Sequence, residues 1–427
     1  MRLLVLFGLL IRCSMGSPCS AEDWPTWRGS QRDGKSSETG LLTEWPAQGP
    51  PQLWKSAGLG NGYASVSIAN GQLFTMGRRE GTEYLICLNA ETGDKLWETA
   101  VGPGSKENGP NSTPTIDENR VFALSFDGEL LCADRQSGRE LWRVNLPRDF
   151  GGKMMSMWGY SESVLVDGDR VICTPGGPRA IMAALNKQTG KPVWTASLPG
   201  TGSRGQDGAG YSSIVISNAG RTKQYVQTIG RGVIGVEAVT GKFLWGYDRI
   251  ANTTANIPTP VVSGDFVLAS TGYDDGGTAL LEIKGTRGRI SPKEVYYLPA
   301  KTLQNHHGGM ILVGDDVYMG HGHNNGFPTC FDLKSGRTSW PKQRGPGTGS
   351  AAVTYADGHL YFRYENGTMA LIEANPREYI LKGTFDENGM FGSGVRWAHP
   401  VIAHGKLYLR ANDELVCFDL RQDPASR

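Results

Sequence analysis

Histidine clustering is the feature of this sequence that most directly suggests chemistry. All seven histidines follow residue 305, and four of them form two pairs, His306 and His307 in NHHGG and His321 and His323 in MGHGHNNG. Imidazoles with a carboxylate, such as Asp274 in YDDGG, can hold zinc, copper or another transition ion. Candidate metal ligands are therefore His307, His321, His323 and Asp274, with a solvated glycine-rich loop as the alternative. Because side chains alternate along a strand, His306 and His307 are not both expected to face the site.

Aromatic and polar side chains form a second candidate set. They occur in short segments that precede strand-like apolar runs, among them NGYAS, MWGYSES, GAGYSS and VRWAHP. The set comprises Tyr63, Asn111, Trp158, Tyr160, Tyr211, Asn256, His307, Trp397 and His399. Aromatic rings with a few convergent polar groups are what a small-molecule or peptide site needs. The alternative is that these residues merely plug the centre of the fold.

A repeated turn indicates which elements carry these residues. The stretch LNAETGDKLW at 88–97 returns at 133–142, 185–194, 236–245 and 331–340, each time with Thr-Gly or Ser-Gly four residues before a Trp. Glycine supplies the positive φ of a tight turn, and the small polar residue before it can hydrogen-bond the turn backbone, so each copy predicts a β-hairpin. The tryptophans are 45, 52, 51 and 95 residues apart, which leaves room for one degenerate copy. Such a period with β character is typical of a propeller.

A second turn motif indicates the number of repeats. Eight glycine- or asparagine-marked turns, from IANGQLF to IAHGKLY, separate the first two predicted strands of each unit. The eighth unit lacks its last strand, whereas PQLWKSA at 51–57 is a surplus strand before the first turn. Donating that strand to the last unit would close the ring and bury both sheet edges. We therefore predict an all-β, eight-bladed propeller of four-stranded antiparallel blades over residues 51–421, closed by the N-terminal strand.

This meander topology predicts where the candidate residues meet. In each blade, the start of strand one and the end of strand two lie on the same face of the ring, so the segments that enter the inner strands converge around one mouth of the central channel. The aromatic set should line this mouth, and the two histidine pairs should return to one another across strands one and two of blade six.

The ends of the chain lie outside the predicted ring. A basic start, the apolar run LLVLFGLLI and a small-residue stretch ending at Ala21 predict a signal peptide over residues 1–21, and hence a periplasmic or otherwise exported protein. Cys13 and Cys19 leave a lipid anchor open, and no other stretch is apolar enough to cross a membrane. Residues 22–50, with three tryptophans, should wrap along the outside or lower face of the ring, and residues 422–427 form a tail.

Composition excludes one class of partner. The chain has 43 basic and 42 acidic residues, so no positive field attracts nucleic acid. The repeated tryptophans are expected to wedge between blades, and the cysteines that recur just before the turns are expected to be small apolar strand residues.

The turn motif, the opening WPTWRGSQRDGKS and the lead-in GPPQLW together resemble the bacterial PQQ-like propeller repeat proteins, which include the BamB-like outer-membrane assembly proteins. This resemblance implies an exported, non-catalytic propeller that docks a protein partner in the cell envelope. The unusual mouth keeps a second interpretation open, in which the propeller binds a small molecule or a metal ion there.

The more distant resemblance to quinoprotein alcohol dehydrogenases implies a third interpretation, a PQQ-dependent oxidoreductase. Such an enzyme holds a planar quinone over an aromatic floor, with calcium among carboxylates. Trp158 or Trp397 could be that floor, and Asp127, Asp207, Asp274 or Asp413 could supply oxygen ligands. The chain has no adjacent cysteine pair to act as a lid and is short for that family. PQQ is therefore disfavoured, and a transition metal remains the open alternative for a cofactor.

Overall fold

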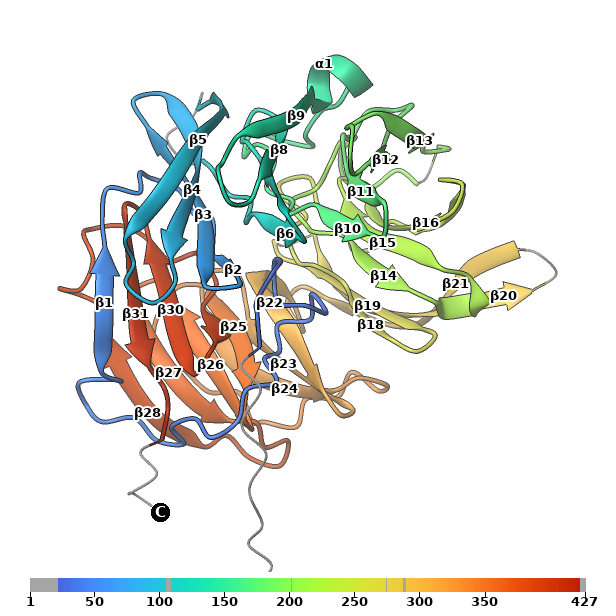
Figure 1. Ribbon diagram of the computed structural model, residues 1–427. Helices are drawn as coiled ribbons and strands as arrows, with labels where there is room; N and C mark the ends of the chain where they lie inside the picture. Colours follow the sequence, from blue (N-terminus) through green and yellow to red (C-terminus); the bar gives the residue numbers. More distant parts are fainter. Residues whose placement is uncertain (1–21, 105–108, 201, 274, 287–288, 423–427) are drawn as a thin grey trace, which may run out of the picture.

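The computed structural model describes residues 22–104, 109–200, 202–273, 275–286 and 289–422. The expected signal peptide with its two cysteines, most of the expected C-terminal tail and Asp274 lie outside these residues. Within them the chain forms eight antiparallel sheets arranged as blades around a ring, as predicted (Figure 1). No helix of the described residues is long and apolar enough to cross a bilayer.

The first four blades follow one another along the chain. Blade 1 contains β2 (Ser67–Ala69), β3 (Gln72–Arg79), β4 (Thr82–Asn89) and β5 (Lys95–Pro103), and blade 2 contains β6 (Thr115–Asp117), β7 (Arg120–Leu124), β8 (Glu129–Asp134) and β9 (Glu140–Asn145). Blade 3 contains β10 (Leu165–Asp167), β11 (Arg170–Cys173), β12 (Met182–Asn186) and β13 (Pro192–Ala196), and blade 4 contains β14 (Val215–Ser217), β15 (Gln224–Ile229), β16 (Gly232–Glu237) and β17 (Phe243–Tyr247). The short helices α1 (Leu146–Phe150) and η1 (Ala219–Arg221) lie in connections.

The remaining blades complete the ring. Blade 5 contains β18 (Val261–Ser263), β19 (Phe266–Thr271), β20 (Gly277–Thr286) and β21 (Arg289–Pro299), and blade 6 contains β22 (Asn305–Val313), β23 (Asp316–His321) and β24 (Phe327–Asp332). Blade 7 contains β25 (Ala351–Ala356), β26 (His359–Tyr364), β27 (Thr368–Glu373) and β28 (Leu381–Asp386), and blade 8 contains β29 (Val401–Ala403), β30 (Lys406–Ala411), β31 (Glu414–Asp419) and β1 (Gln52–Ser56). In blade 6 a single bridge between Phe331 and Thr338 stands where the other blades have a fourth strand.

The N-terminal strand closes the ring as predicted. β1 pairs antiparallel with β31, with Trp54 opposite Cys417 and Ser56 opposite Leu415. One sheet therefore contains both the beginning and the end of the propeller, so neither end leaves an unpaired strand at the join.

The repeated glycine has a packing role in addition to its turn role. Gly93 has a φ of +76°, and its turn is held by Asn89 Oδ1, which accepts from the backbone N–H groups of Glu91 and Thr92. A Cβ on Gly93 would lie 2.5 Å from the Trp54 ring, and Gly241 has the same relation to Trp194. Each of these tryptophans therefore packs on the turn of the next blade, where a side chain would collide with it.

Apolar side chains of adjacent blades fill the space between the sheets. One such cluster joins Phe122, Leu130 and Trp142 of blade 2 to Val171 and Leu185 of blade 3. The five cysteines of the described residues are buried and free, and four of them lie in third strands or at the matching strand of blade 8. The core is thus a series of interfaces between blades, and the centre of the ring is left for other contacts.

Part of the N-terminal segment occupies that centre, whereas the sequence predicted that it wraps along the outside or lower face of the ring. The Arg32 guanidinium is buried and donates to the carbonyls of Ser163, Val164 and Ile214 in blades 3 and 4. Arg28 donates to the carbonyl of Met310 in blade 6, on another side of the ring. Residues 24–36 therefore enter the channel as a plug whose arginines donate to backbone carbonyl groups of blades 3, 4 and 6. The following residues leave it, and Trp45 packs against blade 7.

Candidate functional site

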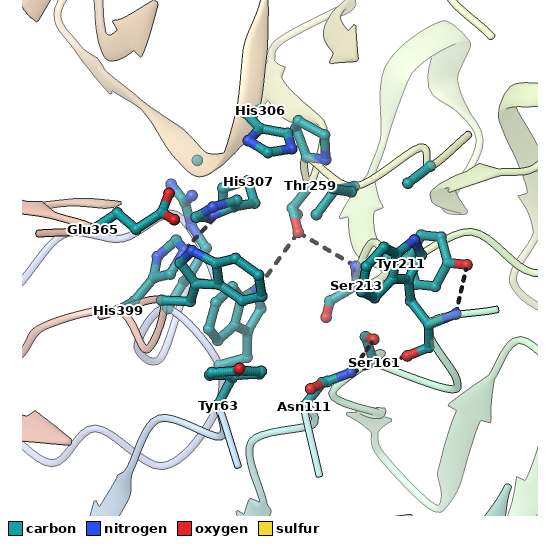
Figure 2. A pocket seen from close by; sticks show the side chains of 18 of the residues that line it. Tyr63, Asn111, Ser161, Tyr211, Ser213, Thr259, His306, His307, Glu365 and His399 are labelled. Atoms are coloured by element: carbon teal, nitrogen blue, oxygen red, sulfur yellow. Dashed lines mark hydrogen bonds between the residues drawn. The ribbon is translucent and has the colours of Figure 1, made fainter. Parts of the chain in front are cut away.

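A cavity of about 350 Å³ lies at the mouth of the central channel, above the plug (Figure 2). Its walls come from the segments that enter the inner strands and from loops after the second strands of blades 5, 6 and 7. The lining side chains include Trp27, Arg28, Tyr63, Asn111, Trp158, Ser161, Tyr211, Ser213, Ile257, Thr259, Tyr273, His306, His307, His323, Glu365, Trp397 and His399. We call this space the mouth cavity.

The structure brings most of the predicted aromatic set together. Tyr63, Asn111, Trp158, Tyr211, His307, Trp397 and His399 all line the mouth cavity. Tyr160 and Asn256 do not. The Tyr160 hydroxyl is buried and donates to the carbonyl of Pro175, and the Asn256 amide donates to the carbonyls of Ile229 and Gly230. Both side chains therefore hold neighbouring backbone rather than face the cavity.

Trp397 is at the centre of the aromatic wall on one side. Its ring lies 4.7 Å from that of Tyr63 and 5.4 Å from that of His307, measured between centroids. On the other side the Tyr211 hydroxyl hydrogen-bonds Ser156 Oγ at 2.7 Å and accepts from the backbone N–H of Trp158 at 3.3 Å. Figure 2 shows the space between Tyr63 and Tyr211 that these two walls border. The aromatic faces are therefore held in place before any ligand arrives.

Residues of the plug form the floor of the mouth cavity. Trp27 packs on His399 with ring centroids 4.5 Å apart, and its Nε1–H group donates to Thr259 Oγ1 at 3.5 Å. Arg28 lies beside them, and burial lowers the pKa of its guanidinium to about 10, so it stays charged at neutral pH. Sequence reasoning missed these residues because WPTWRGSQRDGKS has no strand periodicity. Its dense tryptophan and arginine content was the signal that could have indicated a buried segment.

The expectation that His306 and His307 face different sides is wrong, since both line the mouth cavity. β22 pairs with β23 at Asn305 and again from Met310 onward, with a register shift between them. Gly309 has a φ of +77°, and its backbone N–H group is held by Asn305 Oδ1. This bulge interrupts the alternation of side chains on which the expectation depended.

Three of the four histidines among the described lining residues are neutral at physiological pH. Burial and neighbouring imidazoles lower the pKa of His306 to about 2 and that of His307 to about 3. Burial, followed by the nearby Arg28 charge, lowers the pKa of His399 to about 3. Burial also raises the pKa of Tyr63, so its phenol stays protonated. Among the described lining residues, Arg28 is the one guanidinium and Glu365 is the one carboxylate.

The predicted metal ligands are only partly assembled. His307 and His323 line the cavity, but His321 does not, and its Nδ1 lies 3.3 Å from the carbonyl oxygen of Gln304. His306, which packs on His323 at 4.4 Å, already has both ring nitrogens near hydroxyls, those of Ser350 and Tyr273. Over the described part of the chain, no group of three or more His, Cys, Asp or Glu side chains is arranged to hold a metal ion.

Three further residues of the walls were missed for separate reasons. Thr259 and Ser161 lie in segments that sequence reasoning placed at the mouth, but small polar side chains carried no distinguishing signal there. Glu365 follows β26 in a turn that matches no repeat of the motif. Its carboxylate accepts from the backbone N–H of Ser350 at 3.3 Å.

Comparison with known proteins identifies relatives of more than half of the chain. A family model described as outer membrane protein assembly factor BamB matches residues 46–130 and 81–342. The BamB of Kangiella koreensis is 28% identical over 224 residues, which cover 49% of this chain and 48% of that protein. This chain therefore spans about half the length of that curated relative.

Two solved structures share the fold at low identity. The crystal structure of BamB from Moraxella catarrhalis matches with a TM-score of 0.60 and 14% identity, covering 87% of this chain and 98% of that one. Quinohemoprotein alcohol dehydrogenase from Comamonas testosteroni matches with a TM-score of 0.65 and 12% identity, covering 94% and 81%. The likeness extends to a BamB and to an alcohol dehydrogenase, so it shows the fold and leaves the activity to the residues of the site.

Proposed function

This chain belongs to the family of PQQ-like β-propellers described as outer membrane protein assembly factor BamB, and from that premise we propose that it is an exported, non-catalytic binding propeller of the cell envelope. The observation that carries the proposal is the mouth cavity, a preformed space of about 350 Å³ with aromatic walls. This volume is within the range of about 300–1,000 Å³ that is typical of ligand sites. The ligand is held at the mouth, and the closed ring provides the rigid support.

The chemistry of the cavity supports binding rather than catalysis. An effective general base has a pKa near the working pH, whereas the pKa values of His306, His307 and His399 are lowered to about 2 or 3. Glu365 is the one carboxylate among the described lining residues, so no pair of carboxyl groups is present there to divide acid and base roles. The cavity is therefore suited to hold a molecule without transforming it.

The residues do not fit a quinone with calcium. Such a site needs several carboxylate oxygens around the ion, whereas Glu365 is the one carboxylate among the described lining residues, and two of the four aspartates suggested by the sequence are engaged elsewhere. Asp207 pairs with Arg231 at 2.7 Å, and Asp413 accepts from the backbone N–H groups of Gly58 and Gly60. Neither is among the residues that line the mouth cavity. We therefore assign no step to PQQ.

Docking of a protein partner is a second candidate function, which the names of the relatives favour. One observation on this chain supports it. Met157 is 74% exposed and its neighbour Trp158 is 38% exposed at the rim of the cavity. Exposed methionine and tryptophan are enriched where proteins meet. A partner that covers this rim would also close the mouth cavity, so the two functions could share one surface.

Native mass spectrometry of the mature protein, purified from envelopes and compared with its denatured mass, tests the proposal. We expect wild type to retain a small organic molecule, and Trp397→Ala to lose it while keeping the melting temperature within a few degrees. A retained metal mass would instead favour the metal-binding alternative. Suppose that wild type and variant both show the mass of the polypeptide alone, and that a crosslinker at residue 157 reproducibly captures one partner protein. Docking of a partner, rather than ligand binding, would then be the function of this surface.

The same denatured mass tests export. Cleavage after Ala21 gives a polypeptide that begins at Glu22. An added mass of acyl chains on a product that begins at Cys13 or Cys19 would place the protein on a membrane through a lipid anchor. An intact N-terminus would contradict processing of the signal peptide.

A further inference from the structure

We infer that the mouth cavity binds an uncharged carbohydrate, with one sugar ring against Trp397 and its hydroxyl groups on the polar side chains around it. The inference rests on the proposed function, since it names the class of ligand that the same cavity takes. It is carried by three properties of the cavity: flat aromatic faces, the absence of net charge, and hydrogen-bonding groups of both kinds that are left without partners.

The aromatic faces come first. Trp397 and Tyr63 form one wall, and Trp158 and Tyr211 form the other. An aromatic ring has a negative face, which attracts the weakly positive C–H groups of a neighbouring molecule. A pyranose presents such C–H groups on its faces and hydroxyl groups around its edge. A wall of indole and phenol rings therefore matches the apolar face of a sugar.

The charge balance argues against an ionic ligand. His306, His307 and His399 are neutral at pH 7 because their pKa values are lowered far below it. Of the two charged lining residues, Arg28 already donates to the carbonyls of Asp33 and Met310. The Glu365 carboxylate is opposite in sign and accepts from Ser350 N. The formal charges cancel, so neither a cation nor an anion finds the surplus of opposite charge that would compensate its desolvation.

Spare hydrogen-bonding groups decide between a sugar and a purely apolar ligand. His399 Nε2 lies 3.0 Å from the carbonyl oxygen of His307, which can only accept, so this nitrogen carries the proton. In the neutral ring Nδ1 is then an acceptor. It has no partner among the described residues, although His399 is only 6% exposed.

Other lining side chains repeat this pattern with both polarities. Over the described chain, the Trp397 Nε1–H donor, the Asn111 Oδ1 acceptor and His307 Nε2 also have no partner. A buried polar group without a partner costs about 1–3 kcal/mol. These atoms are covered by their neighbours, so small rotations of the rings are needed to reach them. A ligand that both donates and accepts around its edge would remove the cost, and hydroxyl groups do both.

Binding to a glycan array followed by titration tests this inference. The titration probes are maltose and N,N′-diacetylchitobiose, with tetramethylammonium and benzoate as charged probes of similar reach, all followed by tryptophan fluorescence and by ligand-observed NMR. We expect at least one neutral glycan to bind wild type. Trp397→Ala should weaken that binding at least tenfold. Trp97→Phe is the matched control, because Trp97 packs on Phe74 and Gly138 between blades, away from the cavity, and it should bind as wild type does.

A second variant separates a polar role from loss of fold. Asn111→Leu keeps the size of the side chain but removes the Oδ1 acceptor, and it should weaken glycan binding severalfold with unchanged circular dichroism. Binding of tetramethylammonium or benzoate in the absence of glycan binding, sensitive to Trp397→Ala, would overturn the carbohydrate inference and leave the binding function standing. Glycan binding that is equal in Trp397→Ala and wild type would overturn the placement in the cavity. No binding of any probe, with a bare native mass, would overturn both.

Discussion

The two ends of the central channel contain similar kinds of residue in opposite states. At the plugged end, Arg32 is 5% exposed and its guanidinium donates to three carbonyls and to Thr26 Oγ1. At the open end, His399 and Trp397 are also covered, but each keeps a polar atom that has no partner among the described residues. Polar groups that are fully paired stabilise the ring, whereas buried polar groups without partners cost stability. Within the channel, this difference distinguishes Arg32 from the two lining residues that we propose contact a ligand.

The largest effect is expected at the plugged end. Arg32→Met keeps most of the side-chain volume but leaves the buried carbonyls of Ser163 and Ile214 without the guanidinium donor, whereas the Val164 carbonyl still accepts from Thr115 Oγ1. At about 1–3 kcal/mol for each unpaired group, partly offset by removal of a buried charge, we expect a loss of about 3–5 kcal/mol in the free energy of unfolding. Urea titration followed by circular dichroism measures it.

An arginine on the surface provides the control for that variant. Arg231 forms an ion pair with Asp207, whose side chain is 60% exposed, and exposed pairs contribute little. Arg231→Met should therefore change the free energy of unfolding by about 0.5 kcal/mol or less. If Arg32→Met cost no more than Arg231→Met, the plug would not stabilise the ring, and the contrast between the two ends would fail.

The next largest effect is a loss of stability at low pH, which we expect from His307 at the open end of the channel. The folded-state pKa of His307 is about 3, below its ordinary 6.5, so the unfolded chain binds a proton there that the folded chain does not. The stability that depends on neutral His307 is present above pH 6.5 and is lost as the pH falls from 6.5 toward 3. The groups around His307 are His306, His323, His399, Glu365 and Arg28.

His307→Phe removes this titration and keeps a ring beside Trp397. At about 1.4 kcal/mol per pH unit for one proton, we expect the variant to gain about 2 kcal/mol on wild type between pH 6.5 and pH 4.5. Burial raises the pKa of Glu162 to about 8, so the contribution of this residue to stability increases as the pH falls. Both proteins contain Glu162, so this opposite trend cancels when their free energies of unfolding are compared. Parallel stability curves for wild type and variant over this range would show that His307 is not held neutral by the fold.

The repeated motif made the ring predictable from the sequence. Contacts that do not repeat from blade to blade were harder to predict. Glycine and tryptophan at a fixed spacing indicated blades, because the turn and the wedge recur together in five of the eight units. The same spacing did not reveal that Gly93 and Gly241 lie directly under tryptophans of the preceding blades. The positive φ of a tight turn was already a sufficient reason for glycine at these positions, so no packing contact was inferred. Topology then placed the aromatic residues at one mouth, because the direction of entry into an inner strand is common to all blades.

Side-chain direction within that mouth could not be predicted from the topology. Tyr160 lies two residues after Trp158, yet it turns into the core between blades and bonds the Pro175 carbonyl, whereas Trp158 reaches the rim. His306 joined the site through a bulge that depends on an amide of Asn305 and on Gly309. A single side-chain direction or a single bulge occurs once in the chain, so no periodic pattern in the sequence predicts it.

The smallest effect on stability is expected from Trp158→Ala at the rim. The Trp158 side chain is 38% exposed, so less apolar area is lost from the interior than for a fully buried tryptophan, and the free energy of unfolding should fall by about 1–2 kcal/mol rather than the ~3–5 kcal/mol of a buried one. Binding should fall at least tenfold, because an aromatic wall opposite Trp397 is removed. Parallel urea titration and ligand titration separate the two quantities. A variant that lost stability and binding in proportion would show that the open end is built like the plugged one. A variant that lost binding alone would show that the rim residue serves the ligand, and that the fold is held from the other end of the channel.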